Sequence, residues 1–136
     1  MRIRSSLIIG IILGSLMVLA ATTALAENEL SAEEVTELFS GKTVEGINVN
    51  KGYSFKAYFD PNGTVRAKYA VGGRQGKWRV DKKGRKCIKW EDQRKEKCFV
   101  LVKEGEVYKE FKIRKDGRRK HVATFKKFNE GNHYGL

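Results

Sequence analysis

The stretch YSFKAYFDPNGTVRAKYAV, residues 53–71, decides the fold. Apolar and polar side chains alternate along both of its halves, so that Phe55 and Phe59 share one face of the first half and Val65 lies on the matching face of the second. This period of two is typical of a half-buried β-strand. The segment DPNG at 60–63 joins the halves, because proline presets the first torsion of a turn and glycine accepts a positive one. The stretch therefore predicts two antiparallel strands joined by a tight turn.

The same alternation continues toward the C-terminus. No helical pattern separates the later strands, so parallel crossovers are excluded. The chain therefore predicts an antiparallel up-and-down meander of seven or eight strands that closes into a small barrel, which removes exposed strand edges; a two-sheet sandwich is the alternative. The glycines of GGRQG, residues 72–76, are expected to form a turn between two strands. Five further runs have strand character and are separated by turns rich in Gly, Asp and Lys: 76–81, 86–90, 97–102, 107–113 and 121–128.

One helix is predicted ahead of the strands, over residues 31–40. Ser31 and Glu34 form the capping-box pattern at its start. Apolar residues then recur on one face from Val35 onward, and Gly41 stands where a left-handed residue commonly ends a helix.

The N-terminus has the pattern of a secretory signal peptide. MRIRSS carries two arginines, the apolar run LIIGIILGSLMVLAA follows, and TTALA places small residues before a cut. We expect residues 1–26 to be removed and residues 27–136 to form a single domain. An uncleaved anchor is the alternative, but the run is shorter than the roughly 18 to 20 residues of a spanning helix. The mature protein is therefore predicted to be periplasmic or secreted, with no stable membrane span.

The only two cysteines lie in KCIKWEDQRKEKC, residues 86–98. If the turn is centred between residues 92 and 93, the two strands pair symmetrically about it and Cys87 lies opposite Cys98. Directly opposite residues in an antiparallel pair have Cβ atoms about 4.5–5.5 Å apart, which is close to disulfide geometry. In an exported protein this register predicts one intramolecular disulfide.

Metal binding and redox activity are two other uses of a pair of thiols. A metal site needs more ligands, and only His121 and His133 are available, at no zinc-like spacing. A redox-active pair usually occupies a C-x-x-C turn, which this segment is not. No metal or cofactor is therefore predicted. The same register turns Trp90 toward the interior with other large residues, which predicts a filled core; a lipocalin-like carrier would instead need an open mouth and an unfilled cavity.

The chain is strongly basic, with 28 Lys and Arg against 16 Asp and Glu. Such a charge attracts anionic polymers or surfaces, and predicted export argues against nucleic acid as the partner. Side chains on one face of adjacent strands become neighbours, so the positions opposite the apolar set should form one cationic patch; an ordinary solvated outer face is the alternative. This predicted basic face consists of Lys56, Tyr58, Arg66, Lys68, Lys77 and Arg79.

No recognisable catalytic pattern is present: the chain has no G-x-S-x-G, no H-E-x-x-H and no glycine-rich phosphate loop after a strand. We expect a non-enzymatic binding module for an anionic cell-envelope component, namely an acidic polysaccharide, lipopolysaccharide or lipid head group. The alternative is a periplasmic protein inhibitor or chaperone-like partner of an envelope enzyme.

The order of the motifs resembles that of a family of small exported bacterial proteins, domain of unknown function 995. The segments that carry the resemblance are LSAEEVTELFSGKTVEG, YFDPNGTVRAKY, GKWRV, CIKW, KCFVL and FNEGN. They span essentially all of the mature chain. The resemblance implies a periplasmic or secreted setting, a disulfide, and an association with envelope or exopolysaccharide biology. It implies no reaction and no catalytic residues.

Overall fold

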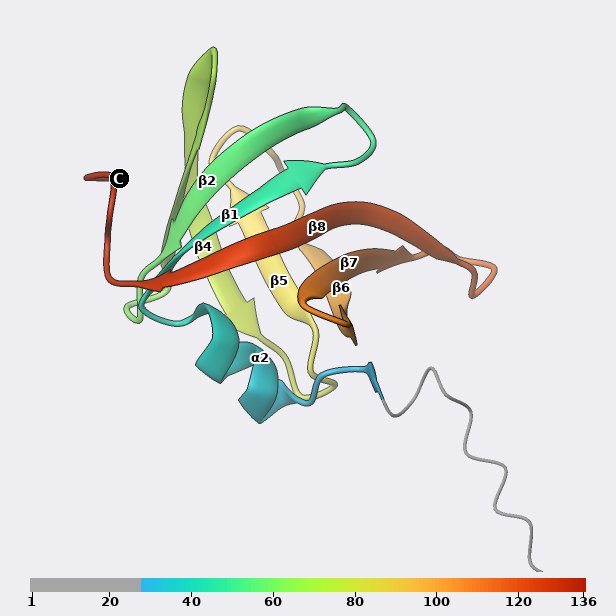
Figure 1. Ribbon diagram of the computed structural model, residues 1–136. Helices are drawn as coiled ribbons and strands as arrows, with labels where there is room; N and C mark the ends of the chain where they lie inside the picture. Colours follow the sequence, from blue (N-terminus) through green and yellow to red (C-terminus); the bar gives the residue numbers. More distant parts are fainter. Residues whose placement is uncertain (1–27) are drawn as a thin grey trace, which may run out of the picture.

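A closed antiparallel β-barrel of eight strands, preceded by one short helix, makes up residues 28–136 in the computed structural model, which describes that part of the chain (Figure 1). Each strand pairs with the next one along the chain, and the first pairs with the last. The predicted barrel is confirmed, and the two-sheet sandwich is wrong. The elements are α2 (Ala32–Phe39), β1 (Lys42–Asn48), β2 (Tyr53–Phe59), β3 (Thr64–Tyr69), β4 (Gly72–Val80), β5 (Lys86–Trp90), β6 (Lys97–Glu104), β7 (Val107–Ile113) and β8 (Arg119–Glu130).

The predicted signal peptide, residues 1–26, lies outside the described residues. Among residues 28–136, no helix has the length and hydropathy needed to cross a membrane.

The helix begins and ends as its sequence predicts. Ser31 Oγ accepts a hydrogen bond from the Glu34 backbone at 3.2 Å, and Glu34 Oε1 accepts one from the Ser31 backbone at 3.1 Å, which completes the capping box. At the other end Ser40 is the C-cap and Gly41 has a φ of 75°, a left-handed conformation that favours glycine. The predicted helix is therefore confirmed, with its two outermost residues serving as caps.

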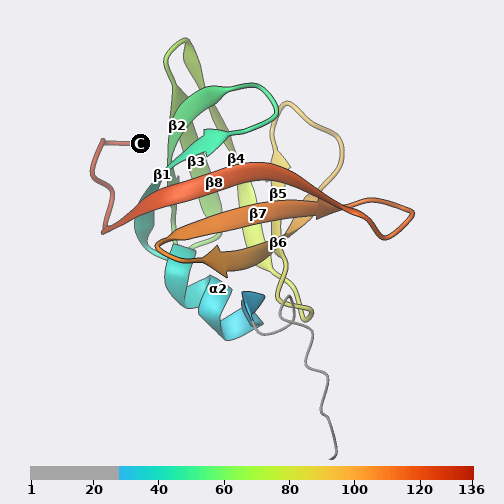
Figure 2. The same ribbon diagram turned by 45° about the vertical axis from the view of Figure 1, so that its right-hand side comes forward.

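The two ends of the barrel differ. The end that carries α2 is called the closed end (Figure 1). Phe39 fills it: its side chain is fully buried, and its ring centroid lies 5.0 Å from that of Phe59 and 5.2 Å from that of Phe125. Because the strands run up and down, alternate hairpins gather at the opposite end, which we call the open end (Figure 2). Its four turns are residues 49–52, 70–71, 91–96 and 114–118.

Two segments around glycines differ from the sequence predictions. GGRQG is not a turn, because β4 already begins at Gly72 and the turn is only residues 70–71. A Cβ on Gly76 would lie 2.5 Å from the Lys89 backbone oxygen, so this glycine lets neighbouring strands approach closely. The first strand, β1, was not singled out by the alternation of its sequence. It contains Gly46, where a Cβ would meet the Thr124 backbone oxygen at 2.6 Å.

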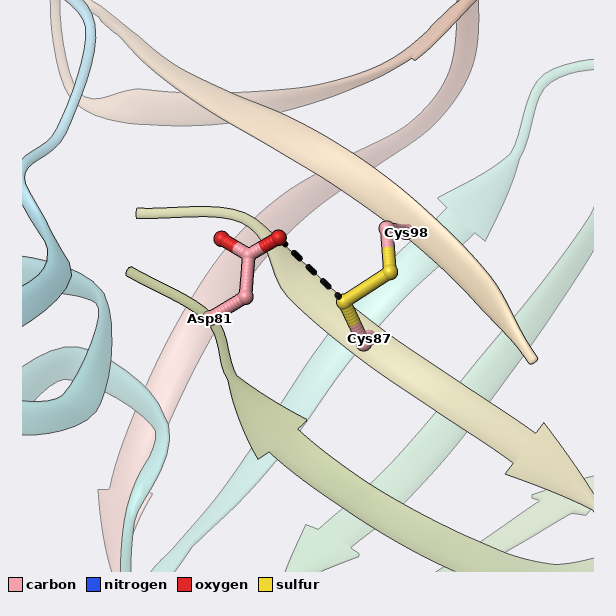
Figure 3. Close-up of side chains that lie close together, drawn as sticks. All are labelled: Asp81, Cys87 and Cys98. Atoms are coloured by element: carbon pink, nitrogen blue, oxygen red, sulfur yellow. Dashed lines mark hydrogen bonds between the residues drawn. A yellow bond between two sulfur atoms is a disulfide. The ribbon is translucent and has the colours of Figure 1, made fainter. Parts of the chain in front are cut away.

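Cys87 lies directly opposite Cys98 and the two form a disulfide, which confirms that prediction (Figure 3). The ladder between β5 and β6 contains only three residue pairs, the fewest of any neighbouring strands in the barrel. The disulfide therefore links the two neighbouring strands that share the fewest residue pairs. Asp81 Oδ2 lies 3.9 Å from Cys87 Sγ, but sulfurs joined to each other offer no free thiolate to a metal ion.

Candidate ligand-binding cavity

A cavity of about 510 Å³ opens at the open end and extends into the barrel, with residues from all eight strands in its walls. A buried apolar core fills the half of the barrel next to α2, so the prediction of a filled interior holds there and is wrong for the half at the open end. Ala57 and Ala67 face each other across β2 and β3, and Ala123 lies opposite Glu110 across β7 and β8. Methyl groups at these three inward positions leave space that larger side chains would fill. The volume lies within the range of about 300–1,000 Å³ that is usual for small-molecule sites.

Aromatic side chains form much of the cavity wall near the open end. Tyr53 and Tyr69 pack edge to face, with ring centroids 5.0 Å apart. Trp90 points inward as predicted, but it lines the cavity together with Phe55 and Phe99 and does not complete a solid core. The wall therefore offers a broad apolar surface to a ligand.

The floor of the cavity holds a buried ion pair. Lys86 is 1% exposed and Glu110 is 6% exposed, and Lys86 Nζ lies 3.0 Å from Glu110 Oε1. The same ammonium lies 4.3, 4.9 and 4.4 Å from the ring centroids of Phe39, Phe59 and Phe125. Burial lowers the pKa of Lys86, because it penalises the charged form, and the negative charge of Glu110 opposes that shift.

Neither member of this pair was identified from the sequence. For Lys86 the signal was present, because in KCIKW the alternation that turns Ile88 and Trp90 inward turns Lys86 inward as well. For Glu110 the alternation of apolar residues along the strand predicts the wrong orientation. VYKEFKI places the apolar Phe111 on the opposite face from Glu110, so hydrophobicity alone favours the wrong face of β7.

An arginine lies across the mouth of the cavity. Arg74 Nη2 donates to Asp92 Oδ1 at 2.8 Å, and the guanidinium carbon lies 4.6 Å from the Trp90 ring centroid. Partial burial acts to lower the pKa of Arg74, but its hydrogen bonds with Asp92 and Tyr69 outweigh burial and raise it. The hydrogen bond from Arg74 also lowers the pKa of Asp92. Arg74 is thus held as a cation beside an aromatic surface.

Unpaired polar atoms point to the same cavity. Among residues 28–136, three buried side-chain polar atoms have no hydrogen-bond partner: Arg74 Nε, Gln93 Oε1 and Glu110 Oε1. All three residues line the cavity. Glu110 Oε1 lies 3.0 Å from the Lys86 ammonium, so its charge is compensated, and Arg74 Nε and Gln93 Oε1 are the two atoms of this set that also lack an ionic partner. A buried polar atom without a partner is costly, and a bound anionic group that accepts a hydrogen bond from Arg74 Nε would satisfy the one unpaired donor of this set.

The cavity is strongly cationic. Seven basic side chains line it against a single acidic one, Glu110. A concave site lined by one sign of charge concentrates the field and attracts ligands of the opposite sign. The basic residues are Lys51, Arg74, Lys86, Lys97, Lys112, Arg114 and Lys120.

The predicted basic face lies on the outer surface of β2, β3 and β4. The ladder places Lys56 opposite Lys68 and Tyr58 opposite Arg66, while Lys77 lies farther along, opposite Thr64. The chain itself engages three of its six members. Lys56 pairs with Glu45 at 3.9 Å, Arg66 Nη1 donates to the Leu136 carbonyl at 2.9 Å, and Arg79 pairs with Glu96 at 2.6 Å.

A shallow groove adjoins this face. It has a volume of about 610 Å³, and its lysines come from β2, from the end of β3 and from β8, with Tyr134 of the C-terminal tail beside them. Its volume exceeds that of the barrel cavity, but none of the unpaired buried atoms lines it. The interior cavity is therefore the stronger candidate site. The groove lysines are Lys56, Lys68, Lys126 and Lys127.

Comparison with protein-family models, with curated proteins and with solved structures gives no match to this chain. The resemblance described from the sequence motifs is not tested by these comparisons and stays a prediction, so the site is interpreted from its own geometry.

Proposed function

We propose that the protein is a non-enzymatic binding protein that holds an anionic amphiphile inside the barrel. The apolar part of the ligand lies against the aromatic wall, and its anionic group lies at the mouth beside Arg74. The export and the envelope setting predicted from the sequence belong to this proposal. The disulfide supports an oxidising compartment, because such bonds are rare in reducing cytoplasm.

The observation that carries the proposal is the coincidence of three features in one cavity. The cavity contains the space left by three alanines, its lining carries seven basic side chains against one acidic one, and the unpaired buried donor Arg74 Nε belongs to that lining. An apolar ligand alone would leave the basic side chains of the cavity without a counter-charge from the ligand. A small polar anion alone would leave the aromatic wall exposed to water.

The test uses dodecanoate as the probe and Trp90 fluorescence as the readout, with dodecanol and dodecyltrimethylammonium as uncharged and cationic comparisons. We expect dodecanoate to bind at least tenfold more tightly than either comparison at low salt. Arg74→Gln should weaken dodecanoate binding at least tenfold. Ala67→Leu should abolish it, because the larger side chain occupies the cavity.

The matched control is Lys82→Gln, which removes one exposed charge at the closed end. It should leave binding unchanged. Equal affinity for the three dodecyl compounds, or unchanged dodecanoate binding in both cavity variants, would overturn the proposal. Circular dichroism of each variant establishes that the barrel is intact.

A second candidate function rests on the outer groove. Four lysines and a tyrosine along an open groove are suited to an acidic polysaccharide, which was the ligand class predicted for the basic face. Polygalacturonate is the probe. If the groove binds it, the double variant Lys68→Glu/Lys127→Glu should lose binding while Lys82→Glu retains it; equal binding by all three proteins would remove this candidate.

A further inference from the structure

The open end of the barrel carries most of the exposed apolar side chains. Four large hydrophobic residues of the described chain are exposed, and three of them belong to open-end hairpins: Val49, Val71 and Ile113. Val71 is 99% exposed at the tip of the turn between β3 and β4, where its side chain has no intramolecular role. Single exposed apolar residues are ordinary, but their collection at one end of a molecule marks an interaction surface.

Basic residues accompany these apolar tips. Residues 112–120, which form the hairpin between β7 and β8, contain six Lys and Arg against one Asp. Arg118 pairs with Asp116 and Arg119 with Glu29, and the other four form no ion pair within the described residues. The turn 91–96 contains three acidic residues, but Asp92 is paired with Arg74 and Glu96 with Arg79. Arg94 and Lys95 of the same turn are exposed. The open end therefore presents a positive field.

The closed end lacks this combination of features. Its helix carries Glu33, Glu34 and Glu37 and no Lys or Arg, although the adjoining turn 81–85 contains three basic residues against Asp81. None of the exposed large hydrophobic residues lies in α2 or in the closed-end turns. Exposed apolar tips and the most basic hairpin therefore lie together only at the open end, the end that a negative surface attracts.

The open-end hairpins also have a suitable shape. In Figure 2 the tips of the four hairpins lie along one line, so they end near a common plane. The cavity opens among these tips. A flat, cationic rim with apolar tips meets the two needs of interfacial binding, namely attraction to anionic head groups and insertion of apolar side chains among the acyl chains.

We propose that the open end docks on the surface of an anionic phospholipid bilayer, with Val71 inserted and the hairpin 112–120 against the head groups. This goes beyond the proposed ligand binding, because Val71 and Lys115 at the hairpin tips do not line the cavity, although Lys112, Arg114 and Lys120 of the same hairpin do. When the protein is docked in this way, the cavity mouth faces the bilayer. An amphiphile can then pass between the bilayer and the cavity without crossing water.

The test is co-sedimentation with vesicles that contain phosphatidylglycerol and with vesicles of phosphatidylcholine alone. We expect at least tenfold stronger binding to the anionic vesicles, and a steep loss of that binding as salt is raised. Val71→Asp and Lys115→Glu should each weaken it several-fold. Lys82→Glu, the matched charge reversal at the closed end, should leave it unchanged.

Orientation is tested with a tryptophan probe and brominated acyl chains. The fluorescence of Val71→Trp should be quenched more strongly than that of Lys82→Trp, each compared with the wild-type background from Trp78 and Trp90. Equal binding to both kinds of vesicle, equal effects of Lys115→Glu and Lys82→Glu, or stronger quenching at residue 82 would overturn docking by the open end.

The two proposals fail separately. The cavity variant Ala67→Leu should still bind anionic vesicles, whereas Val71→Asp should still bind dodecanoate in vesicle-free solution. Loss of vesicle binding in Ala67→Leu would show that lipid uptake into the cavity, and not docking of the rim, retains the protein on vesicles.

Discussion

The buried ion pair on the cavity floor gives the most demanding test of the structure. Replacing Glu110 with Gln keeps the size of the side chain but leaves the ammonium of Lys86 without a counter-charge in a site where the lysine is 1% exposed. Removing one partner of a buried pair typically costs about 3–5 kcal/mol. The Gln carbonyl can still accept a hydrogen bond, and three aromatic rings surround the ammonium. We therefore expect a loss at the lower end of this range, about 3 kcal/mol.

The assay is urea unfolding followed by tryptophan fluorescence. A double variant, Lys86→Met/Glu110→Met, should recover the stability or exceed that of the wild type, because replacing both buried charges by apolar groups of similar volume is often neutral or stabilising. The control is Asp116→Asn, which breaks an exposed pair with Arg118 and should leave the urea midpoint nearly unchanged. If Glu110→Gln shifts the midpoint no more than Asp116→Asn does, the floor pair is not buried and the reasoning is refuted.

The pH dependence of the same variant has a definite sign. Burial lowers the pKa of Lys86 in the folded protein below its ordinary 10.5, and removal of Glu110 takes away the charge that opposes this shift. Between the folded and unfolded pKa values, the unfolded chain binds more protons, so the free energy of unfolding rises with pH. The deficit of Glu110→Gln should therefore shrink as the pH approaches about 10.5, and a deficit independent of pH would contradict the assignment.

Three further predictions concern the scaffold. Replacing Cys87 and Cys98 by Ala should lower the free energy of unfolding by on the order of 3 kcal/mol, measured by urea unfolding against the oxidised protein; an unchanged midpoint would contradict this. Gly46→Ala should destabilise the barrel by about 1–3 kcal/mol in the same assay, because its methyl group would lie 2.6 Å from a backbone oxygen of β8. Burial acts to raise the pKa of Asp81, but hydrogen bonds from the backbone and side chain of Arg85 outweigh it and lower that pKa, so stability should fall as the pH drops below about 4. In Asp81→Asn the free energy of unfolding should fall less steeply with pH below about 4. An unchanged pH dependence would show that other carboxylates cause the loss of stability in acid.

Much of the fold follows from local patterns in the sequence. Alternation along residues 53–71, the DPNG turn and the capping box at Ser31 each depend on a few adjacent residues, and the structure confirms all three. The disulfide could be placed because a short hairpin has only one symmetric register. By contrast, the sequence predicts a turn at Gly72 and Gly76, since glycine suits tight turns and close strand contacts equally well and only the neighbouring strand distinguishes them.

The cavity could not be predicted from the same patterns. Ala57 and Ala67 count as apolar in an alternating strand, so the pattern predicts a core without showing that their small side chains meet across one ladder. Lys86 and Glu110 come from strands that are not neighbours in the sheet, and their proximity depends on the curvature of the closed barrel. Strand parity places the predicted basic residues on the outer face, but it gives no guide to the basic residues of the cavity mouth, most of which lie at strand ends or in turns.

The closure of the sheet between β1 and β8 has a consequence for how the chain acquires its fold. The hydrogen bond from Thr43 Oγ1 to the Gly131 carbonyl spans 88 residues, so this seam cannot form until nearly the whole chain has been synthesised. The hairpins on either side of it are local and can form earlier. During that interval β1 has an unpaired edge of the kind that invites pairing with another chain. A truncation that removes β8 should therefore yield not a smaller barrel but an aggregating sheet.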